Sequence, residues 1–219
     1  MKRELFCSDV FEWLNQNPLT DGTSVVASMP DFSEFSNTTL GEYKNIFTDM
    51  AEKILIATPP NDVTIFYQSD IKVDGRWLDK AFLVQKAAEK LNHAQLWHKV
   101  ICRVPPGMTT FGRPSYTHIL AFSKNYTLDP KDSSADVLPQ MGEKLWERGM
   151  GVKGAMMMAK FIKEKVGSHT LVNPFCGMGS LLAVGNAYEL NVVGIERSPK
   201  RLKSAEVVKF SIESESFSQ

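Results

Sequence analysis

Cysteine is scarce in this chain, and the cysteines that occur form no recognisable site. Cys7, Cys102 and Cys176 lie far apart in the 219 residues and include no C-x-x-C pair. A disulfide framework needs a higher density of cysteine, and a structural zinc site needs ligands at short spacing. The sequence therefore predicts neither a disulfide scaffold nor a metal site, and it favours an intracellular compartment, the cytoplasm or an organellar matrix.

Long apolar runs and an excess of charge are also absent. No run approaches the roughly 18 apolar residues of a membrane span, and the N-terminal segment MKRELFCSDVFEW has no apolar run typical of a signal peptide. Lysine plus arginine equals aspartate plus glutamate, at 25 each, so no global positive field attracts the protein to nucleic acid. We expect no membrane partner, and we expect any polyanion to be bound through a local patch.

The length and the 43% apolar content predict one domain with a single core. We expect a catalytic half at residues 1–124, a linker rich in proline and polar residues at 125–149, and a cofactor-binding half at 150–212. The polar end of the chain is expected to fray.

Short β-branched runs alternate with helical patterns along the sequence. The predicted strands are Leu5–Ser8, Thr23–Ser28, Val63–Gln68, Trp97–Val104, Ser115–Phe122, Thr170–Asn173 and Val192–Glu196. Apolar residues at three- and four-residue spacing predict helices at Leu40–Ile56, Trp77–Leu91, Lys153–Val166 and Ser180–Leu190. The alternation is typical of an α/β fold with a mostly parallel, seven-stranded sheet and helices on both faces. A Pro- and Gly-rich link between the fourth and fifth strands predicts one antiparallel hairpin.

The strongest chemical signal is the segment TLVNPFCGMGSLLAVGNAYELNVVGIE, which ends at Glu196. The segment reads as a strand, a glycine turn, a helix, a second strand and an acid. Gly177 and Gly179 permit a close turn that exposes backbone N–H groups, and a carboxylate at the next strand end can accept hydrogen bonds from ribose hydroxyls. This unit predicts a Rossmann-like fold that binds a nucleoside cofactor, rather than a purely structural turn and helix cap. Because a third glycine is missing, a dinucleotide is disfavoured.

The segments NPFCGMGS and VGIE resemble the cofactor motifs D-P-F-x-G-x-G-T and G-I-E of a known family. The family is that of class I S-adenosylmethionine-dependent amino-methyltransferases acting on adenine N6 or cytosine N4 in DNA. The resemblance implies S-adenosyl-L-methionine as the cofactor. It assigns cofactor binding to Asn173, Pro174, Phe175, Cys176, Gly177, Gly179 and Glu196.

Three further segments resemble this family in the order of its circularly permuted members, with the catalytic segment first. Residues 6–35 resemble the segment that ends in D-P-P-Y, which implies Asp9 as a contact to the cofactor adenine. Residues 98–124 are similar to the family's hairpin. Residues 149–162 look like its H-P-T-Q-K-P helix start, which implies Lys153 as a cofactor contact.

Methyl transfer depends mainly on holding the acceptor atom in line with the methyl group. In the resembled enzymes a polar side chain and a proline carbonyl hold the target amine, while an aromatic ring stacks on the extruded base. The resemblance assigns the first two roles to Ser28 and Pro30, but Asp31 occupies the aromatic position. Asp31 is therefore either a catalytic group that accepts a proton or hydrogen bond, or the N-cap of a turn. Phe32 is the remaining candidate for stacking.

Two further residues are expected at the substrate cleft. Asp70 follows the end of a strand, and Arg113 lies among basic residues of the hairpin, which are alternatively a solvated face. No segment is long enough for the target-recognition region of the resembled DNA enzymes. We therefore expect a methyltransferase of a nucleic-acid base that prefers structured RNA (tRNA or rRNA) to DNA, with an accessory subunit or as a homodimer. The alternatives are a non-catalytic scaffold with this fold and a methyltransferase of a protein or small molecule.

Overall fold

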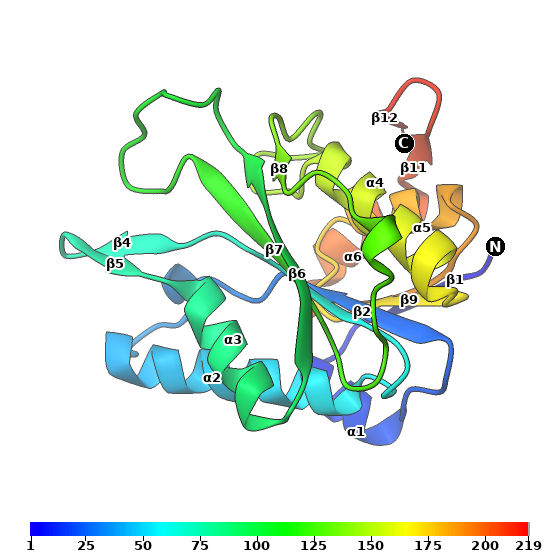
Figure 1. The fold of residues 1–219 in the computed structure, drawn as a ribbon, viewed down its shortest axis with the longest axis horizontal. Coiled ribbons are helices and arrows are strands. Elements are labelled where there is room, and N and C mark those ends of the chain that lie inside the picture. Colours follow the sequence, from blue (N-terminus) through cyan, green and yellow to red (C-terminus); the bar gives the residue numbers. More distant parts are fainter. Residues whose placement is uncertain (219) are drawn as a thin grey trace.

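The computed structural model describes residues 1–218 and contains an eight-stranded sheet (Figure 1). The strands of this sheet are β1 (Arg3–Phe6), β2 (Thr23–Ala27), β3 (Thr64–Gln68), β6 (Ala94–Cys102), β7 (Tyr116–Ser123), β8 (Val137–Leu138), β9 (Thr170–Asn173) and β10 (Asn191–Ile195). Their order across the sheet is β1-β10-β9-β2-β3-β7-β6-β8. β7 runs antiparallel to β3 and β6, and the other neighbouring pairs of this sheet are parallel.

All the strands predicted from the sequence form, and one more joins them. β8 lies inside the segment expected to be a linker and pairs with β6 through Val100↔Val137 and Ile101↔Leu138. β8 has only two residues, which is too short to show the alternation of apolar and polar residues from which a strand is predicted. The prediction of seven strands is therefore one strand short.

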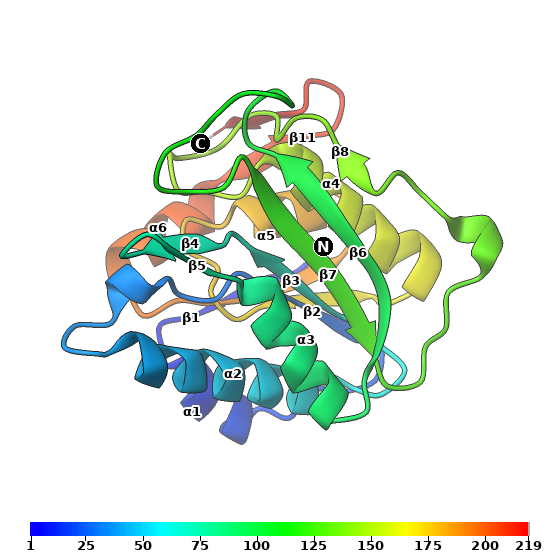
Figure 2. The same ribbon diagram turned by 60° about the vertical axis from the view of Figure 1, so that its left-hand side comes forward.

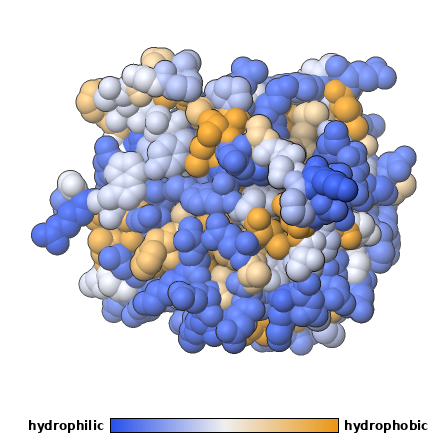
Figure 3. All heavy atoms as spheres, viewed as in Figure 1, coloured by the Kyte–Doolittle hydropathy of each residue, from blue (hydrophilic) through white to orange (hydrophobic). Residues whose placement is uncertain are grey.

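Helices cover both faces of the sheet, as predicted (Figures 1 and 2). One face is covered by α1 (Val10–Gln16), α2 (Leu40–Ala57) and α3 (Lys80–Lys90), and their apolar residues pack around Tyr43, Phe47 and Phe66. The other face is covered by α4 (Val152–Phe161), which a π-helical turn extends through Ile162–Val166, by α5 (Ser180–Ala187) and by α6 (Pro199–Val207). None of the helices within residues 1–218 has both the length and the apolar character needed to cross a bilayer. On the face drawn in Figure 3, hydrophilic residues predominate and apolar residues form small separate patches.

Two small hairpins depart from the sequence expectations. β5 (Arg76–Leu78), which pairs with β4 (Ile71–Val73), occupies the start of the helix predicted at Trp77–Leu91. Asp74 and Gly75 both have positive φ there, and the Asp-Gly pair is a strong hairpin signal that the helical pattern obscured. At the end of the chain, β11 (Lys209–Ser211) pairs with β12 (Ser216–Ser218) where fraying was expected, and the rings of Phe210 and Phe217 lie 5.3 Å apart across this hairpin.

The first strand of the chain is joined to its last helix. β1 pairs in parallel with β10, and the Arg3 guanidinium donates to the carbonyl oxygens of Ala205 (2.9 Å) and Val208 (2.7 Å) at the end of α6. It also donates to Asn186 Oδ1 at 2.9 Å. The N-terminal strand thus takes the place in the sheet that follows α6, which is the arrangement implied by a circularly permuted order.

The five parallel strands β1, β10, β9, β2 and β3 end at one edge of the sheet. Open α/β sheets bind ligands outside the carboxyl ends of their strands. Residues at this edge are therefore the first candidates for a functional site.

Candidate active site

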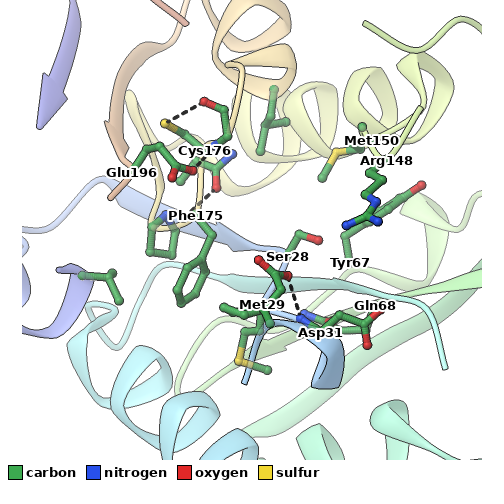
Figure 4. Close-up of a pocket in the computed structure, with 18 of the residues that line it drawn as sticks. Ser28, Met29, Asp31, Tyr67, Gln68, Arg148, Met150, Phe175, Cys176 and Glu196 are labelled. Atoms are coloured by element: carbon green, nitrogen blue, oxygen red, sulfur yellow. Dashed lines mark hydrogen bonds between the residues drawn. The ribbon is translucent and has the colours of Figure 1, made fainter. Parts of the chain in front are cut away.

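A cavity of about 1380 Å³ opens at this edge of the sheet (Figure 4). The loops that follow all five parallel strands line it, together with part of the segment between β8 and α4. A pocket for one small ligand usually measures about 300–1,000 Å³. The cavity therefore has room for a cofactor and an acceptor group side by side.

The glycine turn after β9 and the acid after β10 meet in this cavity. Gly177 N donates to Glu196 Oε2 at 3.1 Å, and Ser198 N donates to Glu196 Oε1 at 2.8 Å. Gly177 has φ +54°, and an added Cβ would meet no heavy atom within 4 Å. The turn thus leaves open space above its backbone, and Glu196 joins the turn to the backbone of Ser198, the N-cap of α6.

The rest of the predicted cofactor motif forms the adjoining wall. Asn173, Pro174, Phe175 and Cys176 all line the cavity, and Asn173 Oδ1 accepts a hydrogen bond from Phe175 N at 3.3 Å. Burial, with a smaller contribution from the Glu196 carboxylate, raises the pKa of the Cys176 thiol to about 12. Cys176 is therefore a neutral packing group here rather than a nucleophile.

Asp9 reaches the same cavity from the end of β1. Its Oδ1 caps α1 by accepting from Phe11 N (2.9 Å) and Glu12 N (3.3 Å). Its Oδ2 accepts no hydrogen bond from residues 1–218, so a ligand donor can bind there.

Two residues of the predicted cofactor set lie elsewhere. Gly179 does not line the cavity: it has φ +84°, and an added Cβ would lie 2.7 Å from Ala205 Cα, so it is required for packing the start of α5 against α6. Lys153 is also absent from the lining, because its ammonium group pairs with Glu215 between β11 and β12. Both assignments depended on motif position, which does not specify the direction of a side chain.

The loop after β2 brings the predicted catalytic residues to the cavity. Ser28 is exposed and lines the cavity, and its hydroxyl has no partner among residues 1–218. The carbonyl oxygen of Pro30 accepts a hydrogen bond from the buried Tyr43 hydroxyl at 3.0 Å. Since β2 lies beside β9 in the sheet, this loop adjoins the Gly177 turn.

Asp31 is the N-cap of a 3-10 turn at Phe32–Glu34, which confirms one of its two predicted roles. Its Oδ1 accepts from Lys80 Nζ at 2.9 Å, and its Oδ2 accepts from Arg113 Nη2 at 2.8 Å. Burial alone would raise the pKa of Asp31, but Lys80 and then Arg113 outweigh it, and the pKa lies below its ordinary value. An ionised, doubly paired carboxylate is a weak proton acceptor, so the geometry favours a positioning role.

Of the three residues predicted at the substrate cleft, only one lies there in the structure. Arg113 lines the cavity. Phe32 does not, and its ring packs against Tyr43 with centroids 5.3 Å apart. Asp70 is also outside the lining and fully buried, where it accepts from Trp77 Nε1 (3.0 Å), Lys80 N (2.8 Å) and His118 Nε2 (2.9 Å). Asp70 is therefore an anchor for the start of α3 rather than a substrate contact.

The cavity also contains residues that were not singled out from the sequence. Lys80 comes from the start of α3, and Tyr67 and Gln68 come from the end of β3. A polar residue at the carboxyl end of a parallel strand indicates a possible ligand contact, and Gln68 could have been identified from the sequence on this ground. Trp146, from the segment after β8, packs near the Arg201 guanidinium of α6 at 5.6 Å and closes one side of the cavity.

No family model and no curated protein sequence matches this chain, but solved structures share its fold. A DNA methyltransferase, PvuII, specific for cytosine N4, superposes with a TM-score of 0.71 at 13% identity, covering 94% of this chain and 86% of its own. A Thermus thermophilus protein assigned as a DNA modification methylase, solved with S-adenosyl-L-methionine, gives 0.68 at 17% identity and covers 93% and 91%. The M1.HpyAVI–SAM complex gives 0.61 at 13% identity and covers 93% and 97%. The chain therefore has the mostly parallel, Rossmann-like fold of these methyltransferase structures.

Proposed function

We propose that this protein is an S-adenosyl-L-methionine-dependent methyltransferase that methylates an amino group of a nucleic-acid base. The proposal rests on the position of two loops that follow adjacent strands and line one cavity. One is the Gly177 turn with Glu196, and the other is the loop of Ser28 and Pro30.

The residues of the glycine turn fit such a cofactor. Both Glu196 carboxylate oxygens keep lone pairs beyond their single backbone bonds, which suits the two ribose hydroxyls. Asp9 Oδ2 is free to accept from an adenine amino group, and Phe175 offers an aromatic side chain in the same wall. The similar Thermus thermophilus and M1.HpyAVI structures were solved with this cofactor. When bound, the cofactor supplies an electrophilic methyl group on sulfonium.

Ser28 and Pro30 suit the handling of an amine. The Ser28 hydroxyl and the second lone pair of the Pro30 carbonyl can accept hydrogen bonds from two N–H groups of an amine. Such bonds direct the nitrogen lone pair toward the methyl group and stabilise the positive charge that the nitrogen gains during transfer. We assign Asp31 the role of holding Arg113 at the cavity, where it can meet a phosphate with the exposed Lys144 and Arg148.

The preference for RNA over DNA predicted from the sequence has no support in the comparisons. The named substrate of the PvuII structure is DNA, and this chain covers 86% to 97% of the three similar chains. Its length therefore does not set it apart from DNA-modifying proteins. We propose nucleic acid as the substrate class, and an accessory subunit or a homodimer stays a prediction.

Calorimetry with S-adenosyl-L-homocysteine tests the cofactor site. We expect Glu196→Ala to weaken binding at least tenfold, because two hydrogen-bonded oxygens are lost, at about 1.4 kcal/mol per decade. Glu206→Ala removes an exposed acid of α6 outside the cavity and should leave binding unchanged. Absence of binding by the wild-type protein would reject the proposal.

Methyl transfer is tested with cofactor labelled on the methyl group and with nucleic acid from cells that lack the gene. We expect label in either the RNA or the DNA fraction, and loss of most of it with Ser28→Ala. Label in RNA alone would restore the sequence-based preference. If the cofactor binds and no fraction is labelled, a non-catalytic scaffold becomes the better explanation.

A further inference from the structure

The loop between β6 and β7, residues 103–115, displays apolar side chains to solvent. Phe111 is 93% exposed and Met108 is 57% exposed, and the nearby Pro105 and Pro106 are exposed as well. In Figures 1 and 2 this loop projects beyond the body of the protein, at the edge of the sheet where β3 ends. A cluster of exposed apolar side chains is typical of a surface that another molecule covers.

Hydrogen bonds and an ion pair hold this loop in one shape. At its base, Arg103 N donates to the carbonyl oxygen of Ser115 at 2.7 Å. The Arg113 guanidinium pairs with Asp31 beside the cavity, and Thr110 Oγ1 donates to the carbonyl oxygen of Arg113 at 2.7 Å. A loop that is already ordered loses little conformational entropy on binding, so its exposed ring is suited to anchor a ligand.

The charge of the loop indicates what kind of molecule covers it. Residues 103–115 contain two arginines and no acid, and both arginines line the cavity. Unlike Arg113, Arg103 has no carboxylate within 4 Å among residues 1–218, and its guanidinium makes only a 3.5 Å contact to Ser69 Oγ. Burial, and then the charge of Arg113, lowers the pKa of Arg103, and an anion beside it would stabilise its charged form.

The β4–β5 hairpin extends the same positive surface. It projects from the same edge of the sheet (Figures 1 and 2), and its exposed Lys72 and Arg76 outnumber its one acid, Asp74. The ring of Trp77 is 48% exposed, and Lys72 Nζ lies 5.2 Å from its centroid. Cations interleaved with exposed aromatic rings match the phosphates and bases of a nucleic acid better than an apolar protein surface or a lipid.

We infer that the loop of residues 103–115 is a binding surface for unpaired nucleic acid, in which Arg103 contacts a phosphate and Phe111 stacks on a base next to the one held in the cavity. Phe111 is two residues from Arg113 of the cavity lining, so about 7 Å of backbone separates them and a neighbouring nucleotide can reach the ring. Every base has a face on which an aromatic ring can stack, so this contact adds affinity without sequence preference. The inference rests on the proposed function, which assigns the target base to the neighbouring cavity.

Fluorescence anisotropy with a short fluorescein-labelled single strand of mixed sequence, as DNA and as RNA, tests the stacking contact. We expect Phe111→Ala to weaken binding of at least one strand about fivefold or more, because one base–aromatic stack is lost. Phe111→Tyr keeps a stacking ring and should bind like the wild type. Ile56→Ala is the matched control, since Ile56 is a 66% exposed apolar residue at the end of α2 that precedes β3, away from the cavity edge. Because the Phe111 ring is exposed, its variants should keep the wild-type melting temperature.

The salt dependence of binding separates the phosphate contact from the stacking contact. Each phosphate of a single strand that a cation neutralises contributes about −0.7 to the slope of log affinity against log salt concentration. Arg103→Gln should therefore reduce the steepness of the slope by about that amount, whereas Phe111→Ala should lower the affinity and leave the slope unchanged. Lys131→Ala, at an exposed lysine outside the cavity, should change neither quantity.

Three outcomes would overturn the inference. They are wild-type affinity in Phe111→Ala, an unchanged slope in Arg103→Gln, and the absence of binding to both strands by the wild-type protein. An equal loss of affinity in Ile56→Ala would also overturn it, because the effect would then not belong to the loop. Failure of S-adenosyl-L-homocysteine to bind would instead reject the proposed function, so the two failures are distinct.

Discussion

At the scale of single residues, Asp31 shows how one side chain serves a turn and a charge cluster together. It caps the turn at Phe32–Glu34 and holds two cations, of which the Lys80 side chain is only 3% exposed. Burial lowers the pKa of Lys80, and Asp31 counteracts this by stabilising its charged form. A buried ammonium group destabilises the fold unless a carboxylate pairs with it.

We therefore expect Asp31→Asn to lower the free energy of unfolding by roughly 2–4 kcal/mol in urea titrations, because it leaves Lys80 without a countercharge. The double variant Asp31→Asn with Lys80→Met should recover part of that loss. If Asp31→Asn were as stable as the wild type and yet inactive, Asp31 would be a catalytic group instead.

The pH dependence of the same difference gives a second check. Because the pKa of Asp31 is lower in the folded protein than in the unfolded chain, its stabilisation is complete above the unfolded pKa of about 4 and is lost as the pH falls through the folded pKa. The difference in unfolding free energy between wild type and Asp31→Asn should shrink in urea titrations below about pH 4. A difference that stayed constant into acid would contradict the ion pair.

At the scale of elements, the turn between β9 and α5 contains two glycines with different duties. Gly177 opens onto the cavity, whereas Gly179 is pressed against the backbone of α6. Both glycines have positive φ. The sequence motif therefore justifies a glycine at each position but does not show that their roles differ.

Substitution of alanine at each position distinguishes the packing role of Gly179 from the cavity role of Gly177. Gly179→Ala should lower the unfolding free energy by roughly 2–4 kcal/mol, because it adds a clash to an unfavourable φ. Gly177→Ala should cost only about 1–2 kcal/mol, the strain of φ alone, but should weaken S-adenosyl-L-homocysteine binding at least tenfold because its methyl group enters the cavity. Thermal melts and calorimetry on both variants measure the two effects, and the reverse pattern would refute the assignment.

At the scale of the whole molecule, the two ends of the sequence build one edge of the sheet. β1 lies beside β10, and Arg3 binds the last carbonyl oxygens of α6. The helix that starts beside Glu196 is thus held at its other end by the third residue of the chain.

Arg3→Ala should lower the unfolding free energy by roughly 2–3 kcal/mol, because several charge-assisted hydrogen bonds are lost and α6 carbonyls are left without a donor. Lys2→Ala is the control, since its side chain is 73% exposed and its ion pair with Glu4 lies on the surface. Urea titrations should show a change below about 0.5 kcal/mol for the control. Equal effects of the two substitutions would contradict the role of Arg3.

The sequence alone determined the features that depend on neighbouring residues. Alternating β-branched and helical patterns located the strands and main helices, and the spacing from Gly177 to Glu196 located the central unit of the cavity. Periodicity and turn chemistry act over a few residues, so they can be read without knowing the fold.

The tertiary structure decided which side chains enter the cavity. Lys153, Gly179, Phe32 and Asp70 were expected there and turn to other partners, while Lys80 and Gln68 enter it from elements far along the chain. Where a side chain points at the end of a strand or helix depends on packing against remote elements. That packing appears only once the sheet has brought them together.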